Sequence, residues 1–432
     1  MMDGNMRIGI QGWGSEGDLR PLIALAAGLV RAGHAVRLDL TPIDGTDPGA
    51  LCRALEVPLR VIPERVDFSL RSVAEHADAA DPLKVSQQLV EQAFFPYLDQ
   101  LYRAALELCA QSDLVIWHYS SWYTKAAALK TGLPHVAVHF FPGLVPTRFA
   151  PPGGLPHLGA LNPLLWFLAR RVLDLQFRRR PARFFAEQGL PPLRHVLPDL
   201  MFSEHLNLHA TSPLLCPPAP DWNPRHQVCG QLELPGVADS WTPSPGLRSF
   251  LEAGEKPVLL SLGSMEHMAP RRTRELLAGA ARKARIRAIV QSKRSPAEEG
   301  RDGDLYFLPW APHRALLRQC SMMVHHGGAG TTHSVLAAGL PAVVVPVIFE
   351  QQVWAHRLRA AGASGKPVPF WKASVDDLAN RILEVAASEA MSARARQLGA
   401  AMATENGVET AIGLLERLRA SGAAEWTGGS SH

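Results

Sequence analysis

Short apolar runs alternate along the chain with longer segments whose apolar residues recur at helical spacing. The short runs are typical of buried strands, and segments such as 21–32 and 271–283 are long enough for helices. The expected strands are 7–11, 35–40, 113–118 and 135–140 in the first half, and 257–263, 286–291, 304–309, 322–327 and 341–347 in the second. This alternation predicts an α/β fold in which helices cover both faces of a parallel sheet.

Proline marks a break between the two halves. It is dense at 212–224 and again at 241–246, and such stretches are typical of domain boundaries. We therefore expect two doubly wound, Rossmann-like domains in tandem, with a ligand in the cleft between them. The expected segments are a first domain at 1–220, a linker at 221–250, a second domain at 251–408, and a last helix with a flexible tail at 409–432.

Composition narrows the class of protein. The chain has 432 residues, 47% apolar and 19% charged, which is ordinary for a globular protein of two or three domains. A net charge of +4 is too small to indicate a nucleic-acid partner. The five cysteines form neither a Cys-x-x-Cys pair nor a Cys/His cluster, so a cytoplasmic location is expected. We find no signal-peptide pattern and no apolar run of the roughly 18 residues that a membrane-spanning helix needs.

Segment 164–185 differs from the rest of the chain because it is apolar at helical spacing and carries six arginines. Two interpretations are open. The segment is either a helix that packs on the core with a solvated basic face, or a helix that lies on a membrane surface. Peripheral membrane contact through 164–185 therefore stands as an alternative to a purely cytoplasmic protein.

The first expected strand leads into a glycine-rich loop. Gly12, Gly14 and Gly17 have the spacing of a dinucleotide-binding turn, and Asp39 lies about where such sites have an acid that binds ribose. An NAD-type site is therefore the first hypothesis for this loop.

Two features of the same loop argue against a dinucleotide. Pro21 favours the first turn of a helix, so we expect the helix to begin near Leu19 or Arg20, after a loop longer than a dinucleotide turn. The carboxylates of Glu16 and Asp18 would also lie beside the pyrophosphate and repel it. The loop is therefore expected to have another role.

Three features of the second half together describe a site for a nucleotide sugar. After the strand at 322–327, glycines lead into an alanine-rich helix, whose N-terminus has free N–H groups and an effective charge of roughly +0.5 that suit a diphosphate. Trp310 follows another strand, and its ring can stack on a nucleobase. Glu350 and Gln351 follow a third strand, and their side chains can bind sugar hydroxyls. The carboxyl ends of the strands line the ligand crevice of an open α/β sheet.

These residues resemble the donor-binding signature of family 1 glycosyltransferases, which have the GT-B fold, and in particular the bacterial and sterol-glycosyltransferase-like branch. The matching positions, in order, are Pro312-His313, 324–332, Pro346, Gln351, Trp354 and Arg357, with 257–265 similar to the first loop of the donor domain. The resemblance implies that the first domain binds the acceptor and the second a UDP- or dTDP-sugar, which is a co-substrate, so no cofactor or metal is expected. The donor-binding residues that it implies are Ser15, Ser264, Trp310, Ala311, His313, His326, Gly328, Ala329, Gly330, Thr331, Glu350 and Gln351.

The resemblance also implies a role for the opening loop. Residues 14–21 are similar to the family's G-S-x-G-D-x-x-P loop, in which Asp18 occupies the position of the general base. Its carboxylate would take the proton of the acceptor hydroxyl, which attacks the sugar from the face opposite the diphosphate and inverts the anomeric centre. A positioned base is typically worth roughly 10²–10⁴-fold in rate. The structural alternative for Asp18 is an N-cap of the following helix.

Acceptor contacts are expected at strand ends of the first domain. The candidates are Trp13, His118, Trp122 and His139, and packing in the core is an equally good interpretation of the last three. The D-x-D at 302–304 contains Asp-Gly and is expected to be a turn, not a metal site.

Two departures from the family pattern leave part of the function open. Glu350 stands where the family normally has Asp, so donor selectivity is open, and Ser334 stands where plant members have a Glu that binds ribose. The expected reaction is transfer of a hexose to a small lipophilic acceptor such as a natural product or sterol. The alternatives are a transferase that acts on membrane lipids and a catalytically silent partner of another transferase. The sequence leaves the acceptor, the sugar and the oligomeric state open.

Overall fold

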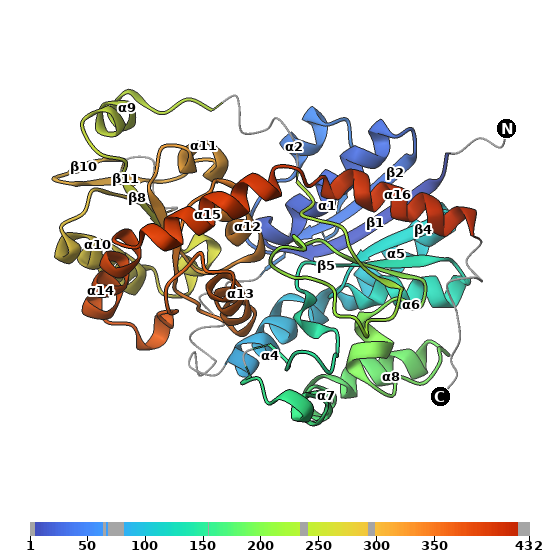
Figure 1. Cartoon of the computed structure of the whole chain (residues 1–432). Helices are drawn as coiled ribbons and strands as arrows, with labels where there is room; N and C mark the ends of the chain where they lie inside the picture. Colours follow the sequence, from blue (N-terminus) through green and yellow to red (C-terminus); the bar gives the residue numbers. More distant parts are fainter. Residues whose placement is uncertain are drawn as a thin grey trace. The chain divides into compact units, whose positions relative to one another are not determined.

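The computed structural model describes residues 5–63, 66–67, 82–153, 155–233, 241–292 and 299–421. The chain divides into two units (Figure 1). Unit 1 comprises 1–69, 87–233 and 406–432, and unit 2 comprises 70–86 and 234–405. Each unit contains one sheet with helices packed on it, fully parallel in unit 1 and parallel except for one strand pair in unit 2, which confirms the predicted α/β fold. The domain boundaries expected at 220, 250 and 408 stay predictions.

Unit 1 is built on a sheet of seven parallel strands in the order β3-β2-β1-β4-β5-β6-β7. The strands are β1 Arg7–Gly14, β2 Ala35–Pro42, β3 Leu59–Val61, β4 Leu114–His118, β5 His135–His139, β6 Leu206–His209 and β7 His226–Val228. Four of them, β1, β4, β5 and β6, are buried almost throughout, as expected for a sheet covered on both faces. Chain order reverses between β1 and β4, and doubly wound sheets bind ligands at this switch point.

The helices of the same part of the chain connect these strands. They are α1 Glu16–Arg31, α2 Gly49–Ala54, α4 Pro82–Ala93, α5 Leu98–Ala110, α6 Trp122–Thr131, α7 Asn162–Phe177 and α8 Arg179–Glu187. The final helix, α16 Gly407–Ala420, also belongs to unit 1 and packs on α1 (Figure 1). The two helices approach closely because a Cβ on Gly28 would lie only 2.2 Å from Val408 Cγ1.

Unit 2 has six strands in the order β10-β11-β9-β8-β12-β13, all parallel except for the antiparallel pair β10 and β11. The strands are β8 Val258–Ser261, β9 Ala288–Gln291, β10 Gly300–Asp302, β11 Leu305–Leu308, β12 Met322–His325 and β13 Ala342–Val344. The helices are α9 Pro245–Glu252, α10 Pro270–Ala284, α11 His313–Leu317, α12 Ala329–Ala337, α13 Phe349–Ala360, α14 Val375–Ala386 and α15 Glu389–Met402. The switch point of this sheet lies between β8 and β12.

Every strand expected from the sequence is present, and the helix expected at 271–283 is α10. The proline-rich stretch at 212–224 contains neither helix nor strand. The D-x-D forms the turn between β10 and β11, where Gly303 has φ +63° and Asp302 pairs with Arg282 at 2.6 Å. The tail expected to be flexible lies, from residue 422 on, outside the described residues. None of the described helices is both long and apolar enough to cross a membrane.

The start of α1 differs from the prediction. The helix begins at Glu16 with Ser15 as its N-cap, so the predicted start near Leu19 or Arg20 is wrong. Pro21 lies inside the helix. The reason is local: the Asp18 carboxylate accepts hydrogen bonds from the backbone N–H and Oγ of Ser15, which stabilise a helix start at Glu16, whereas Pro21 removes one backbone hydrogen bond inside the helix.

Candidate active site

Asp18 lies in the first turn of α1, directly after β1, at the switch point of unit 1. Its Oδ2 accepts hydrogen bonds from the backbone N–H of Ser15 at 2.9 Å and from Ser15 Oγ at 3.0 Å. The carboxylate also lies close against Gly14, where a Cβ would come within 2.4 Å of Oδ2 and where φ is +148°. Asp18 is therefore the third residue of the helix and not its N-cap, and one of its two oxygens is held in place by Ser15.

The surroundings of Asp18 change its acidity. Burial raises the pKa of Asp18 to about 6, against the hydrogen bonds from Ser15 that lower it, and the negative charge of Asp44 raises it further. Among the residues that the structure describes, none donates a hydrogen bond to Oδ1. A carboxylate with a raised pKa and one open oxygen has the properties of a general base.

Asp44 is a residue that the sequence analysis missed. It follows β2, and its Oδ2 accepts a hydrogen bond from the backbone N–H of Glu16 at 3.1 Å. Two carboxylates therefore lie at the N-terminus of α1. The signal was present in the sequence, since Asp44 stands in an Asp-Gly turn directly after a predicted strand of the same sheet.

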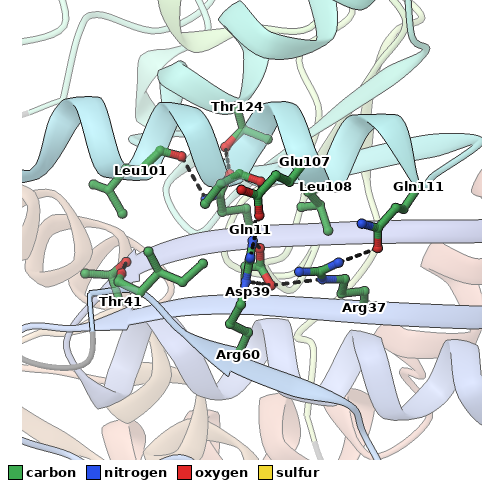
Figure 2. A network of polar contacts seen from close by, with 12 residues as sticks. Gln11, Arg37, Asp39, Thr41, Arg60, Leu101, Glu107, Leu108, Gln111 and Thr124 are labelled. Carbon is green, nitrogen blue, oxygen red and sulfur yellow. Dashed lines mark hydrogen bonds and ion pairs between the residues drawn. The ribbon is translucent and has the colours of Figure 1, made fainter.

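Asp39, the candidate ribose-binding acid, has a structural role instead. Its buried carboxylate contacts Arg60 at 2.5 Å and Arg37 at 3.5 Å, and Arg60 also pairs with Glu107 at 2.7 Å (Figure 2). Figure 2 shows that this network joins β2 and β3 to α5. Because Asp39 is buried and both of its carboxylate oxygens accept hydrogen bonds from Arg60, neither oxygen is available for the hydroxyl groups of a ribose.

The helix does begin inside the glycine motif, so one argument against a dinucleotide is lost. The second argument, that carboxylates at this loop would repel a pyrophosphate, remains and becomes stronger. The backbone N–H groups of Ser15 and Glu16 already bind the carboxylates of Asp18 and Asp44, which a pyrophosphate would have to displace. A dinucleotide is therefore still excluded on electrostatic grounds.

The predicted diphosphate cradle lies at the switch point of unit 2, between β12 and α12. Gly327 has φ +90°, and a Cβ there would lie 2.8 Å from Val344 Cγ1 and 2.9 Å from the carbonyl oxygen of Gln351. Its N–H donates to His325 Nδ1 at 3.1 Å. This turn allows the chain to start α12 with Gly328 as its N-cap.

The N-terminus of α12 is open. The N–H of Thr332 bonds to Gly328 O at 2.9 Å, so the three residues before it, Ala329, Gly330 and Thr331, present the first-turn N–H groups that a helix cannot satisfy itself. A Cβ on Gly330 would meet no atom within 4 Å. An anion can therefore approach this helix end closely.

His326 borders the cradle and packs against two glycines. A Cβ on Gly328 would lie 2.4 Å from His326 Nε2, and one on Gly263, in the loop after β8, would lie 3.1 Å from Cε1. Burial, with a smaller effect of His313, lowers the pKa of His326 to about 4. The ring is therefore neutral at pH 7, and its Nδ1 has no hydrogen-bond partner among the described residues. A neutral ring can still donate one hydrogen bond to a phosphate oxygen.

The other predicted donor residues lie at neighbouring strand ends. Trp310, after β11, leaves 49% of its side chain exposed, as a stacking platform requires. Ala311 is buried, and its carbonyl oxygen lies 3.5 Å from Gln291 Nε2 at the end of β9. Ser264 and His313 are partly buried in the loop after β8 and at the start of α11. The structure thus brings the residues predicted to bind the nucleobase and those predicted to bind the diphosphate to the carboxyl edge of the sheet in unit 2.

Gln351 differs from the simple picture of a sugar clamp. Its Oε1 accepts hydrogen bonds from the backbone N–H groups of Val347 at 2.8 Å and Ile348 at 3.2 Å, so this oxygen caps α13. Only the Nε2 group of Gln351 remains for a sugar. Glu350, one residue earlier, is partly buried in the first turn of the same helix.

The four candidate acceptor residues are all buried in unit 1. Trp13 and Trp122 pack in one aromatic cluster around Phe94, with ring centroids 5.3 and 5.5 Å from it. The pKa values of His118 and His139 are lowered to about 3 by burial. None of the four is more than 6% exposed, which favours the packing interpretation over direct contact with an acceptor.

The chain resembles several known proteins. Residues 289–417 match the family described as Erythromycin biosynthesis protein CIII-like, C-terminal domain. Over 436 residues the chain is 33% identical to O-mycaminosyltylonolide 6-deoxyallosyltransferase of Streptomyces fradiae, covering 95% of this chain and 97% of that protein. It is 28% identical to a sterol 3-beta-glucosyltransferase of Neurospora crassa, over 95% of this chain but only 27% of that longer relative.

A solved structure with the same fold is that of the glycosyltransferase VinC in complex with dTDP. It superposes with a TM-score of 0.63 at 20% identity, over 96% of this chain and 100% of that one. Within the described residues of the present structure, no group of three or more His, Cys, Asp or Glu side chains is arranged to hold a metal ion.

Proposed function

The chain belongs to the family 1 nucleotide-sugar glycosyltransferases of the GT-B fold, and from that premise we propose an inverting enzyme with Asp18 as its general base. The proposed reaction moves a hexose from a UDP- or dTDP-sugar to a hydroxyl group of a small lipophilic acceptor. The observation that carries the proposal is the state of the Asp18 carboxylate, with Oδ2 held by Ser15, Oδ1 open and a pKa raised to about 6.

In the proposed mechanism, an acceptor hydroxyl lies against Asp18 Oδ1. As its oxygen forms a bond to the anomeric carbon, its proton passes to the carboxylate, and the bond from that carbon to the diphosphate oxygen breaks. Attack from the opposite face inverts the centre. We propose that the N–H groups at the start of α12 and the ring of His326 stabilise the charge that develops on the departing diphosphate, which is supported by the open first turn of α12 and by the position of His326 beside Gly328. Electrostatic stabilisation of this kind is usually the largest contribution to catalysis.

We propose that the donor base stacks on Trp310, whose exposed ring supports this placement. The dTDP bound to VinC supports a thymidine or uridine diphosphate as the nucleotide. A thermal-shift panel with UDP, dTDP, their glucose conjugates and NAD⁺ tests the donor class. A ligand at 100 times its dissociation constant stabilises a protein by about 2.7 kcal/mol, so a cognate diphosphate should raise the unfolding midpoint by several degrees. A shift with NAD⁺ and with none of the others would refute the proposal.

The names of the relatives support a bulky, largely apolar acceptor, since one acts on O-mycaminosyltylonolide and others on sterols. Trial acceptors of both kinds, a macrolide aglycone and a sterol, therefore suit a product-release assay with the donor that the thermal-shift panel selects.

The test of the base is the variant Asp18→Asn, which keeps the shape of the side chain and the oxygen that accepts from Ser15. We expect turnover to fall about 10²–10⁴-fold while the thermal shift caused by the donor stays the same. Glu16→Gln is the matched control, since it removes a carboxylate two residues away on the same helix turn, and we expect near-normal turnover. Near-normal turnover of Asp18→Asn would remove Asp18 from the mechanism.

A further inference from the structure

Exposed large apolar side chains are concentrated on one surface of unit 1. Nine of the thirteen that the described residues contain lie between Phe149 and Leu175. Five of these form a stripe along α7, here called the α7 face, and each is between 43% and 83% exposed. The α7 face consists of Leu161, Leu164, Leu168, Val172 and Leu175. Single exposed leucines are ordinary on protein surfaces, but a continuous stripe of them indicates a binding surface.

The opposite side of α7 is firmly attached to unit 1, so the exposure of the α7 face does not come from a loose helix. Trp166 is buried, and its indole N–H donates to the carbonyl oxygen of Ala150 at 2.8 Å. Asp174 accepts a hydrogen bond from the backbone N–H of Val196 at 2.8 Å and pairs with His195 at the same distance. The helix therefore presents the α7 face on a fixed support.

Positive charge accompanies the α7 face. Residues 162–187 contain six arginines and two acidic residues, a net charge of +4 that equals the net charge of the whole chain. Both acids are engaged, Asp174 with His195 and Glu187 with Arg183 at 2.7 Å. Arg171, Arg178 and Arg179 are exposed, and none of them pairs with a carboxylate of the described residues.

We propose that the α7 face and its arginines bind the surface of an anionic phospholipid bilayer. A helix that lies flat in the headgroup region needs an apolar stripe to enter the acyl boundary and arginines to contact lipid phosphates. The α7 face supplies about 21 Å of stripe at 1.5 Å per residue. Arg171, Arg178 and Arg179, which have no carboxylate partner in the described part of the chain, match the charge of the lipid. A partner helix could also cover the leucines of the α7 face. However, contact with the leucines alone would not explain why the exposed arginines lie beside them. Binding of this kind brings the enzyme to lipophilic acceptors dissolved in the bilayer, and it does not depend on the identity of the sugar donor.

The experiment is co-sedimentation of the full-length protein with two kinds of vesicle. One is phosphatidylcholine alone, and the other is phosphatidylcholine mixed with phosphatidylglycerol. We expect binding to the anionic vesicles, weaker binding to the neutral ones, and a loss of binding as salt is raised. Replacing Arg171, Arg178 and Arg179 together by Gln should weaken binding to anionic vesicles on the order of 100-fold. Replacing Leu164, Leu168 and Leu175 together by Gln should weaken binding to both kinds.

Variants with the same kinds of substitution elsewhere on the surface serve as controls, three arginines and two leucines. Arg248, Arg359 and Arg417 are exposed arginines elsewhere, and Leu214 and Leu383 are exposed leucines elsewhere; replacing either set by Gln should leave vesicle binding unchanged. All substituted side chains face solvent, so each variant is expected to keep the wild-type thermal unfolding midpoint. The proposal would be overturned if the leucine variant of the α7 face and the variant of Arg171, Arg178 and Arg179 both bound vesicles as strongly as the wild type. An oligomer, detected by light scattering, that only the leucine variants of the α7 face dissociate would also overturn it.

Discussion

Asp18 shows how a single buried carboxylate determines the working range of pH. Burial raises its pKa to about 6, and a general base acts only when it is deprotonated. We therefore expect kcat/KM to increase with pH through a step centred near 6 and to stay level above it. Initial rates measured from pH 5 to 8 check this. A profile that is flat down to pH 5 would contradict the assignment of Asp18.

Asp44 provides the control for that profile, because its negative charge is one cause of the raised pKa of Asp18. Asp44→Asn keeps an oxygen that can accept from the N–H of Glu16 and removes the charge. The pKa of Asp18 should fall, since a neighbouring negative charge disfavours the ionised form. The acid side of the profile should then move to lower pH by less than one unit, with turnover at pH 8 unchanged.

At this scale the sequence predicts some roles and misses others for a clear reason. Asp18 and the glycines after β12 belong to short contiguous motifs whose residues act together locally, so their positions are readable. The roles of Asp39 and Asp44 depend on contacts between different strands, with Arg60 and with the backbone of Glu16. Such contacts are set by the register of the sheet, which a single sequence does not contain.

The turn into α12 uses two glycines in different ways. Gly327 is required by the fold, because its φ is +90° and any side chain there would overlap Val344 and the backbone of Gln351. Gly330 is not required by the fold, because a Cβ there meets nothing within 4 Å. An unneeded glycine in the first turn of a helix lowers helix stability by up to about 1 kcal/mol relative to alanine. The proposed diphosphate, which needs close approach to the N–H groups, explains its presence.

Gly330→Ala should therefore stabilise the unliganded protein and weaken donor binding at least about tenfold, as measured by thermal unfolding and by titration calorimetry with UDP or dTDP. Gly17→Ala is the matched control, since Gly17 is also the second residue of a helix and a Cβ there would have its nearest contact at 3.8 Å. The Gly17→Ala variant should raise the stability of the protein and leave its affinity for UDP or dTDP unchanged. Gly327→Ala should destabilise the fold by more than about 1 kcal/mol. Wild-type donor affinity in Gly330→Ala would place the diphosphate elsewhere.

Elements with strong local patterns are the ones that the sequence predicts well. The strands β4, β5, β8 and β12 are mainly apolar and buried throughout because helices cover both faces of a parallel sheet. The missed strands β3, β7 and β10 have only three residues each and lie at the edges of the sheets, where no long apolar run is needed. The missed strand β6 lies inside its sheet but has only four residues, and two of them, Asn207 and His209, are polar. The start of α1 was misplaced because capping by Ser15 and Asp18 outweighs the position preference of Pro21.

For the whole molecule, the return of the last helix is the least predictable feature. The sequence indicates that 409–420 is a helix, but α16 packs on α1 of unit 1 after the whole of unit 2 has intervened. The contact rests on the match between Gly28 and Val408, two residues far apart in the chain. Amphipathic spacing indicates that a helix has a buried face and does not identify its partner.

Buried histidines in both units lead to a prediction about the stability of the whole protein in acid. In eight of them burial lowers the pKa, to about 3 or 4 in seven and well below the ordinary value in His209. Five lie in unit 1 and three in unit 2. The eight are His118, His139, His205, His209, His226, His325, His326 and His333.

Unfolding returns these rings to an ordinary pKa of about 6.5, so below that pH the unfolded chain binds protons that the folded chain does not. The free energy of unfolding therefore falls as pH drops from about 6.5 toward 4, and every ring that stays neutral in the folded protein adds to the fall. Asp18 acts in the opposite direction, since its raised pKa makes the folded state take up a proton between about 4 and 6. One carboxyl group cannot balance several imidazoles. Calorimetry from pH 7.5 to 5 should show unfolding midpoints that drop steeply. The drop should be greater for unit 1, which contains five of the eight rings. Constant midpoints over this range would show that the rings are protonated in the folded protein.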